Sequence, residues 1–135
     1  MVLDNEAVQA LADPRHRKHR RVIAHLQVVA DRKRSAARIA VVVPTSVRVE
    51  VGWDRTEPRW ALANQVGITD VALDAAHSNV AVAIRLGLRE RVSVVDAHVG
   101  SVVQLSAAER VTVISSDPAD MKAVAGERAV VIVAL

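Results

Sequence analysis

The stretch VTVISSDPAD, residues 111–120, contains the unit from which the fold of this chain can be predicted. Residues 111–114 are β-branched, which favours a strand. A short polar turn and the pair Asp117-Pro118 follow, and that pair is typical of a helix start. The unit is therefore a strand, an acidic side chain and a helix in immediate succession. The same order occurs in MVLDNEAV, residues 1–8, where Asp4 separates a short strand from a predicted helix over 5–12.

Strand and helix patterns alternate along the rest of the chain. Apolar residues recur every three or four positions in 16–34, which predicts a helix, and the uninterrupted apolar run 39–43 predicts a strand buried on both faces. Helices are also expected over 57–66, 74–88, 96–105 and 118–125, and strands over 70–73 and 129–135. The helix over 74–88 is apolar on most faces, so we expect it to be buried against the sheet or a dimer mate. The alternation predicts one α/β domain over 1–135, with a mostly parallel sheet covered by helices on both faces.

Residues 44–54 fit two local structures. Three valines alternate with two charged residues over 47–51, as in a strand. Pro44, however, suits the first turn of a helix, and Gly52 suits its end. The local pattern leaves both possibilities open.

The composition excludes several kinds of site. Hydrophobic residues make up 51% of the 135 residues, enough for a core without covalent staples, and the absence of cysteine excludes disulfides and cysteine-based metal sites. With no Phe or Tyr, stacking platforms for bases are nearly unavailable; Trp53 and Trp60 are predicted to be core or interface anchors, with base stacking as the alternative. No signal peptide and no membrane span is expected, so we predict a cytoplasmic protein. The net charge of +3 is compatible with an anionic partner.

Four acidic side chains are expected at one edge of the sheet. Asp4 and Asp117 each follow a strand, Asp96 opens a helix after an apolar run, and Glu50 comes soon after the second strand. The carboxyl ends of parallel strands share one edge, which is where such sheets bind ligands. Carboxylates crowded there repel one another, and Mg²⁺ or Mn²⁺ would relieve the repulsion and activate a water for phosphodiester hydrolysis. The alternative is that each acid caps a helix.

Four motifs, in this order, resemble the PIN domain family, especially the ribonuclease toxins of type II (VapBC-like) toxin–antitoxin modules. They are VLDNEAV (2–8), VVVPTSVRVEVGW (41–53), VSVVDAHVGSVV (92–103) and VTVISSDPADM (111–121). The resemblance implies a three-layer α/β/α PIN-like domain with about five parallel strands, usually dimeric, that cleaves RNA with Mg²⁺ or Mn²⁺ and binds a cognate antitoxin protein. The resemblance also implies that residues 44–52 are helical. The family's catalytic, metal-binding acids map onto Asp4, Glu50, Asp96 and Asp117.

The resemblance also assigns supporting residues. Ser115 or Ser116 matches the family's hydroxyl residue before the fourth acid, and Asp120 is a second-tier acid. The family often has Thr or Ser after the first acid, whereas this chain has Asn5 followed by Glu6. Asn5 can still hydrogen-bond a water or a phosphate. Glu6 would add negative charge if it pointed into the site and would be inert if it pointed outward.

Basic residues gather in RHRKHRR (15–21) and in DRKR (31–34). The candidates for contacts with an RNA backbone are Arg15, Arg17, Lys18, Arg20 and Arg21. A solvated helix face, or a dock for an acidic partner segment, explains the same run. The five histidines show no metal-ligand spacing, and ordinary structural roles are predicted for them.

A second function class fits the same sequence. A non-catalytic α/β module that binds a protein, or a receiver-like signalling domain, would use the acids only as helix caps. The receiver-like form is weakened because the chain has no paired acidic doublet after its first strand, and Lys122 is its sole lysine after Lys33.

Overall fold

In the computed structural model the chain forms one sheet of five parallel strands, in the order β3-β2-β1-β4-β5. The structure describes residues 1–33 and 39–135, and for residues 30–33 the backbone only. The strands are β1 (Val2–Leu3), β2 (Val42–Pro44), β3 (Thr69–Val71), β4 (Val111–Ser115) and β5 (Val130–Ala134). The predicted α/β fold with a parallel sheet is confirmed, and all five strands end at the same edge.

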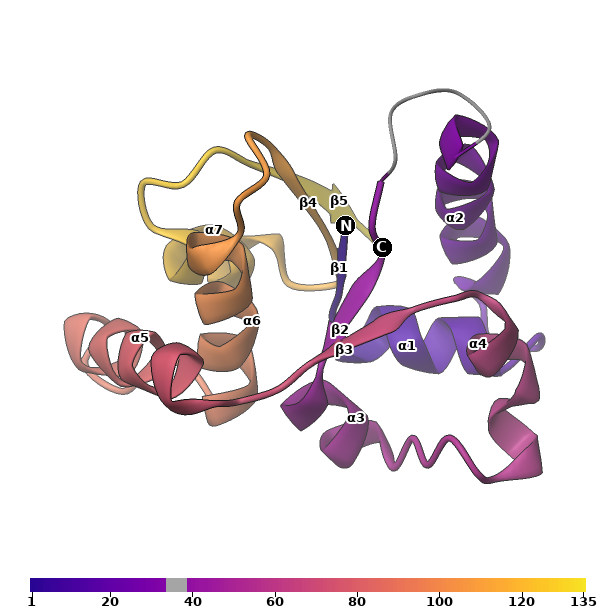
Figure 1. Ribbon diagram of the computed structural model, residues 1–135, viewed down its shortest axis with the longest axis horizontal. Helices are drawn as coiled ribbons and strands as arrows, with labels where there is room; N and C mark the ends of the chain where they lie inside the picture. The colour runs from indigo at the N-terminus through magenta and orange to yellow at the C-terminus, as the bar shows by residue number, and fades with distance from the viewer. Residues whose placement is uncertain (34–38) are drawn as a thin grey trace.

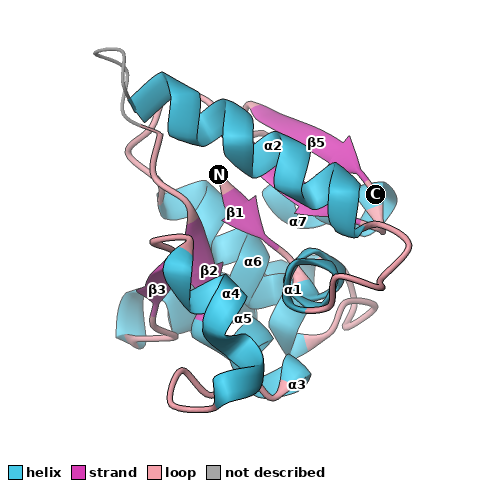
Figure 2. Cartoon of the chain, turned by 90° about the vertical axis from the view of Figure 1, so that its right-hand side faces the viewer, coloured by secondary structure: helices cyan, strands magenta, loops and turns pink. Residues whose placement is uncertain are grey.

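Helices cover both faces of this sheet, which gives three layers (Figures 1 and 2). On one side lie α1 (Asn5–Ala12), α2 (His19–Lys33) and α4 (Ala61–Gln65), the last preceded by the short 3₁₀ helix η1 (Pro58–Trp60). On the other side lie α5 (Ala75–Gly87), α6 (Val94–Leu105) and α7 (Pro118–Ala125). The remaining helix, α3 (Thr45–Val51), lies at the carboxyl ends of the strands.

Residues 45–51 are helical despite their alternating valines. Val47 is fully buried, whereas Val49 is 81% exposed, because α3 packs against α1 through one face only. Gly52 ends the helix with a φ of 68°, in the left-handed region that glycine adopts without strain. The prediction drawn from the family resemblance is therefore confirmed, and the strand alternative is wrong.

Several boundaries differ from the predicted ones. β2 starts at Val42, later than the apolar run suggests, because β1 is only two residues long and pairs Val2 with Val42. α6 starts at Val94, two residues before Asp96, because the Ser93 side chain caps it. The helix expected to begin at residue 16 begins at His19.

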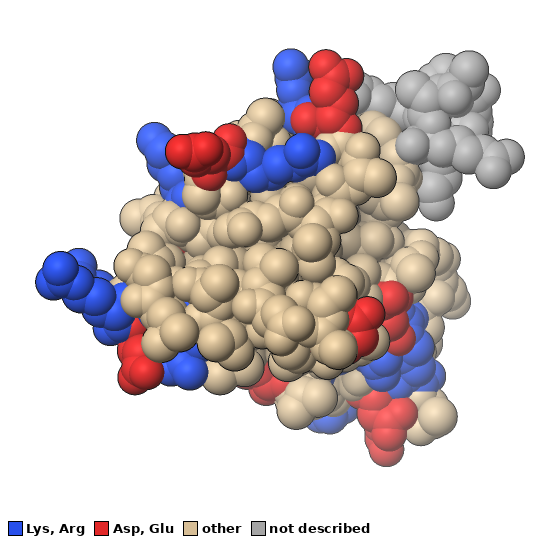
Figure 3. All heavy atoms as spheres, turned by 60° about the vertical axis from the view of Figure 1, so that its left-hand side comes forward, with Lys and Arg blue, Asp and Glu red and all other residues tan. Residues whose placement is uncertain are grey.

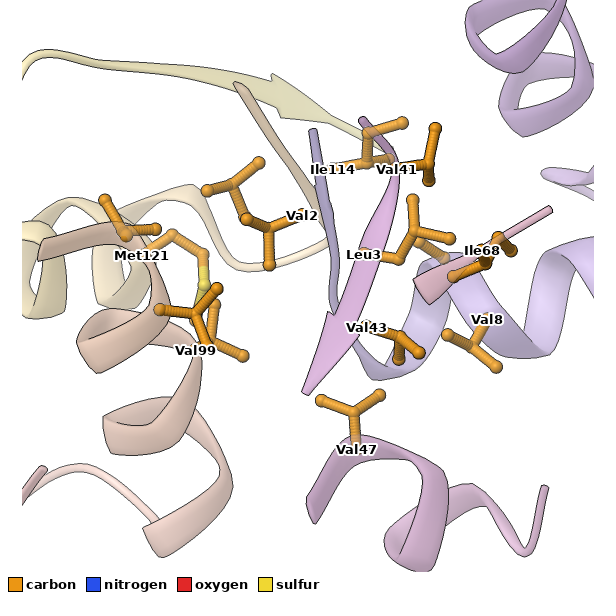
Figure 4. Packing of buried hydrophobic residues seen from close by; sticks show 14 of the residues in the cluster. Val2, Leu3, Val8, Val41, Val43, Val47, Ile68, Val99, Ile114 and Met121 are labelled. Carbon is orange, nitrogen blue, oxygen red and sulfur yellow. The ribbon is translucent and has the colours of Figure 1, made fainter. Parts of the chain in front are cut away.

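The short strand β1 is at the centre of the core. Its two residues point to opposite faces of the sheet, as strand geometry requires. Figure 4 shows Val2 turned toward Val99 and Met121, on α6 and α7, and Leu3 turned toward Val8 of α1. Burial on both faces explains why so short a strand holds its place.

Helix α5 is less buried than its sequence predicts. It packs mainly on α6, where Ala81 and Ile84 are buried, while Val82 and Leu86 are 57% and 65% exposed. The side of the molecule that carries α5, α6 and α7 comes forward in Figure 3, and charged side chains lie around its margin. Burial against the sheet is thus wrong for this helix, and a dimer mate stays a prediction.

Both tryptophans belong to the core. Trp53 and Trp60 are 2% and 5% exposed, and their rings stack with centroids 5.7 Å apart. The guanidinium of Arg55 lies 4.6 Å from the Trp53 ring centroid and donates to Asp70 on β3. The anchor role is confirmed, and base stacking is excluded because neither ring is accessible.

Among residues 1–33 and 39–135, no helix combines the length and the apolar character needed to cross a lipid bilayer.

Gly100 sets how closely α6 approaches α7 and α5. A Cβ at this position would lie 2.7 Å from Cβ of Val124 and 2.9 Å from Cδ1 of Ile84. We expect Gly100→Ala to lower the free energy of unfolding by about 1–3 kcal/mol, the usual effect of overpacking. Gly87→Ala is the matched control: no atom lies within 4 Å of its added Cβ, so it should raise stability by up to about 1 kcal/mol. Urea unfolding followed by circular dichroism measures both, and an unchanged Gly100→Ala protein would contradict the close packing.

Candidate functional site at the carboxyl ends of the strands

The strand order reverses beside β1. From β1 the chain moves outward to β2 and β3, then returns to β4 on the other side of β1. In open α/β sheets, ligands bind at such a switch point, outside the carboxyl ends of the strands. Asp4 follows β1 and Asp117 follows β4, so these two acids flank the switch point.

Asp4 is the most buried of the candidate acids. It is 6% exposed; its Oδ2 accepts a 2.6 Å hydrogen bond from Oγ of Ser115, and its Oδ1 accepts one of 2.7 Å from the backbone N–H of Asn5. Ser115 is fully buried, and its Oγ also accepts from the backbone N–H of Asp117 at 3.0 Å. One hydroxyl thus joins the first acid to the backbone of the fourth. Of the two predicted serines, it is Ser115 that makes this contact, whereas Ser116 is exposed.

Asn5 positions Glu50. Its Nδ2 donates to Oε2 of Glu50 at 2.6 Å, and its own Oδ1 accepts from Nε2 of Gln9 at 2.7 Å. The amide therefore spans from α1 to α3 and holds the second acid beside the first. Gln9 is not among the predicted site residues, although its position four residues after Asn5 places it on the same helix face.

Glu6 points away from the acids. Its Oε1 lies 2.7 Å from Nζ of Lys18 and 3.7 Å from Nε2 of His16. The hydrogen bond from Lys18, with the positive charges nearby, holds the pKa of Glu6 below its usual value. Of the two orientations that the sequence allows, the structure has the outward one, and the negative charge of Glu6 is balanced locally.

The other acids serve as helix caps, as the alternative interpretation requires. Asp96 is the third residue of a capping box: its Oδ2 accepts from the backbone N–H and Oγ of Ser93, and its own N–H donates to that Oγ. Asp117 caps α7 through Oδ1, which accepts from the N–H of Asp120 at 3.1 Å. Each carboxylate offers about four acceptor positions, so capping and ligand binding are compatible.

The acids form one connected field of negative charge. Burial raises the pKa of Asp4, and the charges of Asp96 and Glu50 raise it further, while the hydrogen bonds from Ser115 and Asn5 oppose the shift. Burial, followed by the charges of Asp117 and Asp96, likewise raises the pKa of Asp120. Asp96 therefore acts on acids on both sides of the switch point. No salt bridge within the described part of the chain neutralises Asp4, Glu50, Asp96 or Asp117.

The donor set suits a hard divalent cation. All the candidate ligand atoms are carboxylate oxygens, which Mg²⁺ and Mn²⁺ prefer. Among the described residues, no three His, Asp or Glu side chains stand close enough to hold one ion jointly. Magnesium typically takes one or two carboxylates directly and reaches others through water, so a spread set of acids still fits it.

His98 connects two helices that carry acids. It is fully buried on α6, and its Nδ1 lies 2.8 Å from Oγ of Ser46 on α3. Burial lowers the pKa of His98, which favours the neutral ring. This histidine has the structural role predicted for it, and it braces the helix of Asp96 against that of Glu50.

Three of the five basic candidates lie together at the start of α2. Arg17, Lys18 and Arg21 line a hollow of about 690 Å³ together with Glu6 and Ser116. Arg15 and Arg20 are exposed and do not line this hollow. The side chains of the second basic run, 31–34, lie outside the described residues.

Asp4→Asn is expected to change how stability depends on pH. Because burial raises the pKa of Asp4, the folded protein holds this proton more tightly than the unfolded chain does. The associated stability is present below the ordinary Asp pKa of about 4 and is lost as the pH rises through the higher folded value. In urea unfolding without divalent metal, the stability of the parent relative to Asp4→Asn should therefore fall as pH rises.

Ser115→Ala provides a second test of the pKa shift of Asp4. The hydrogen bond from Ser115 lowers the pKa of Asp4, so its removal should raise that pKa further and increase the stability lost toward neutral pH. A difference between the parent and Asp4→Asn that does not vary with pH would contradict the shift.

No family model matches the chain, and neither a curated protein nor a solved structure matches it. Membership of the PIN domain family therefore stays a prediction that rests on the four sequence motifs.

Proposed function

We propose that this protein is a metal-dependent endoribonuclease, with Mg²⁺ or Mn²⁺ bound at the carboxyl edge of the sheet. Of Asp4, Asp96 and Asp117, one or two would bind the ion directly and the others through water, and Glu50 would complete its shell directly or through water. One observation carries the proposal: a buried carboxylate at the switch point lies in the field of two further acids, without a salt bridge in the described chain to balance it. A bound cation is the simplest way to stabilise such an arrangement.

The reaction would be hydrolysis of a phosphodiester. A water oxygen bonds to phosphorus, the bond from phosphorus to the 3′-oxygen breaks, and that oxygen takes a proton. When bound, a divalent ion supplies a more acidic water and stabilises charge on the phosphate. The protein's own part is positional: Ser115 fixes Asp4, and Asn5, held by Gln9, fixes Glu50.

RNA as substrate is supported by the hollow that includes Ser116, the residue before Asp117, since its two exposed arginines would attract a phosphate backbone. The more specific role, a cytoplasmic toxin that is dimeric and silenced by a cognate antitoxin, rests on the resemblance to the PIN family. The short apolar side chains exposed on α5 are compatible with a dimer contact.

A second candidate, a non-catalytic α/β binding module, is favoured by the capping geometry. Asp4, Asp96 and Asp117 each hydrogen-bond a helix start, which is sufficient reason for an acid at those positions. The two candidates differ in their response to metal, because helix caps alone give no specific binding of a divalent ion.

Asp96→Asn separates the candidates. In the presence of Mg²⁺ or Mn²⁺ the parent should cleave RNA, and a chelator should abolish cleavage. Asp96→Asn should be slower by about a hundredfold or more, since even outer-shell partners of a metal change activity by about 10- to 100-fold. Glu109→Gln, an exposed acid before β4 at the opposite edge of the sheet, is the control and should cleave as the parent does. Equal cleavage by Asp96→Asn after matched purification would refute the mechanism.

Asn5→Ala tests the positioning of Glu50. Loss of the 2.6 Å hydrogen bond should raise the Mg²⁺ concentration for half-maximal activity by about 10- to 100-fold, with a smaller effect from Gln9→Ala. Glu6→Gln should leave the metal dependence unchanged, because Glu6 is paired with Lys18. An Asn5→Ala protein with the metal dependence of the parent would show that Glu50 needs no such support.

A further inference from the structure

We infer that the RNA substrate crosses the acidic site between two arginine-lined hollows, each of which holds a flanking phosphate. This inference rests on the proposed function for the meaning of the acids in the middle. The two hollows are observed independently of it. One lies at the start of α2, and the other lies at the turn between α5 and α6.

The first hollow, of about 690 Å³, has two arginines that form no salt bridge with the residues that the structure describes. Lys18 lines it too, but its ammonium is already paired with Glu6 at 2.7 Å. Arg17 and Arg21 are exposed; Arg17 lies in the turn before α2, and Arg21 lies in the first turn of this helix. Ser116, which precedes Asp117 in the chain, also lines the hollow.

The second hollow, of about 350 Å³, involves residues that the sequence patterns do not single out. Arg89 and Arg91, in the turn between α5 and α6, line it together with Asp120 of α7. Both arginines are exposed. The hollow therefore offers positive charge on one wall and borders the acidic field on the other.

The turn that carries these arginines is held in an unusual conformation. Arg89 and Glu90 both have positive φ, 52° and 58°, which non-glycine residues rarely adopt in succession. Arg85 fixes the turn, because its Nε donates to the carbonyl of Val92 at 3.2 Å and its own carbonyl accepts from Glu90. Strained backbone that the surroundings hold in place is concentrated at functional sites.

Residues 116–120 connect the two hollows. Ser116 lines the first and Asp120 lines the second, and Asp117 stands between them in the chain. In the inferred path, a strand that occupies both hollows passes Asp117. The acids repel a polyanion, so positive charge on each side is what would keep the strand in place.

The lining of the hollows indicates how RNA would be recognised. Each hollow presents two exposed arginines, which suit contacts with the phosphate backbone. Both tryptophans are buried and the chain has no Phe or Tyr, so bases cannot stack on these aromatic rings. Recognition through phosphates predicts binding that is tolerant of sequence and strongly dependent on salt.

The test measures binding apart from cleavage. A fluorescent single-stranded RNA oligonucleotide is titrated in a chelator, at several salt concentrations, against the parent and single Arg→Gln changes at 17, 21, 89 and 91. Each change should weaken binding and reduce the slope of log affinity against log salt, by about one for each phosphate that the protein no longer neutralises. Arg110→Gln removes an equal charge at the opposite edge of the sheet and should bind as the parent does. Glu6→Gln frees Lys18 and should bind more tightly.

The inference is overturned if the parent does not bind the strand or if changes at 89 and 91 behave like Arg110→Gln. Cleavage assays with metal separate it from the proposed function. RNA cleavage that is insensitive to all four arginines would refute the RNA path but not the nuclease activity. Arginine-dependent binding without any metal-dependent cleavage would refute the nuclease activity but not the RNA path.

Discussion

The buried hydrogen bond from Ser115 to Asp4 is the interaction on which the rest of the site depends. It joins the ends of the two central strands, whose register pairs Leu3 with Ile114. A carboxylate this deeply buried is costly unless its oxygens are paired, and Ser115 supplies one partner while the start of α1 supplies the other. Because Ser115 also accepts from the N–H of Asp117, the same hydroxyl sets where α7 begins. Strand register, helix starts and the spacing of two acids are thereby linked.

The structure is compatible with both interpretations of the acids, as helix caps and as metal ligands. Asp4, Asp96 and Asp117 all contact helix starts, and a cap explains each of them taken singly. A cap does not explain why their charges meet at the switch point of the sheet, where Asp96 affects both Asp4 and Asp120. Helix starts attract carboxylates for the same reason that they attract phosphates, so the capping role is compatible with the proposed ligand site.

Charged side chains are distributed unevenly around the site. Glu6, which lies two residues after Asp4 in sequence, is turned toward Lys18. Its negative charge therefore partly neutralises the first basic hollow and is not added to that of the acids. Asn5 is turned the other way and binds Glu50. Two adjacent polar residues on α1 thus support different parts of the surface. Arginines line one hollow that includes Ser116 and another that includes Asp120. A polyanion would meet attraction at the margins and repulsion at the centre unless a cation is bound there.

Local patterns in the sequence suffice for the order of the elements and the edge at which the acids gather. Apolar periodicity and turn residues act over a few positions, and the helices over 5–12 and 118–125 follow from them with correct bounds. The helix over 45–51 does not, because the local pattern also fits a strand and packing against α1 decides. Tertiary structure alone decides which serine hydrogen-bonds Asp4, from 111 residues away in the sequence. It also decides that Asn5 hydrogen-bonds Glu50, which lies 45 residues further along the chain. It also brings one arginine pair into a hollow with Ser116 and another into a hollow with Asp120, because such contacts depend on how strands and helices pack and leave no periodic trace in the chain.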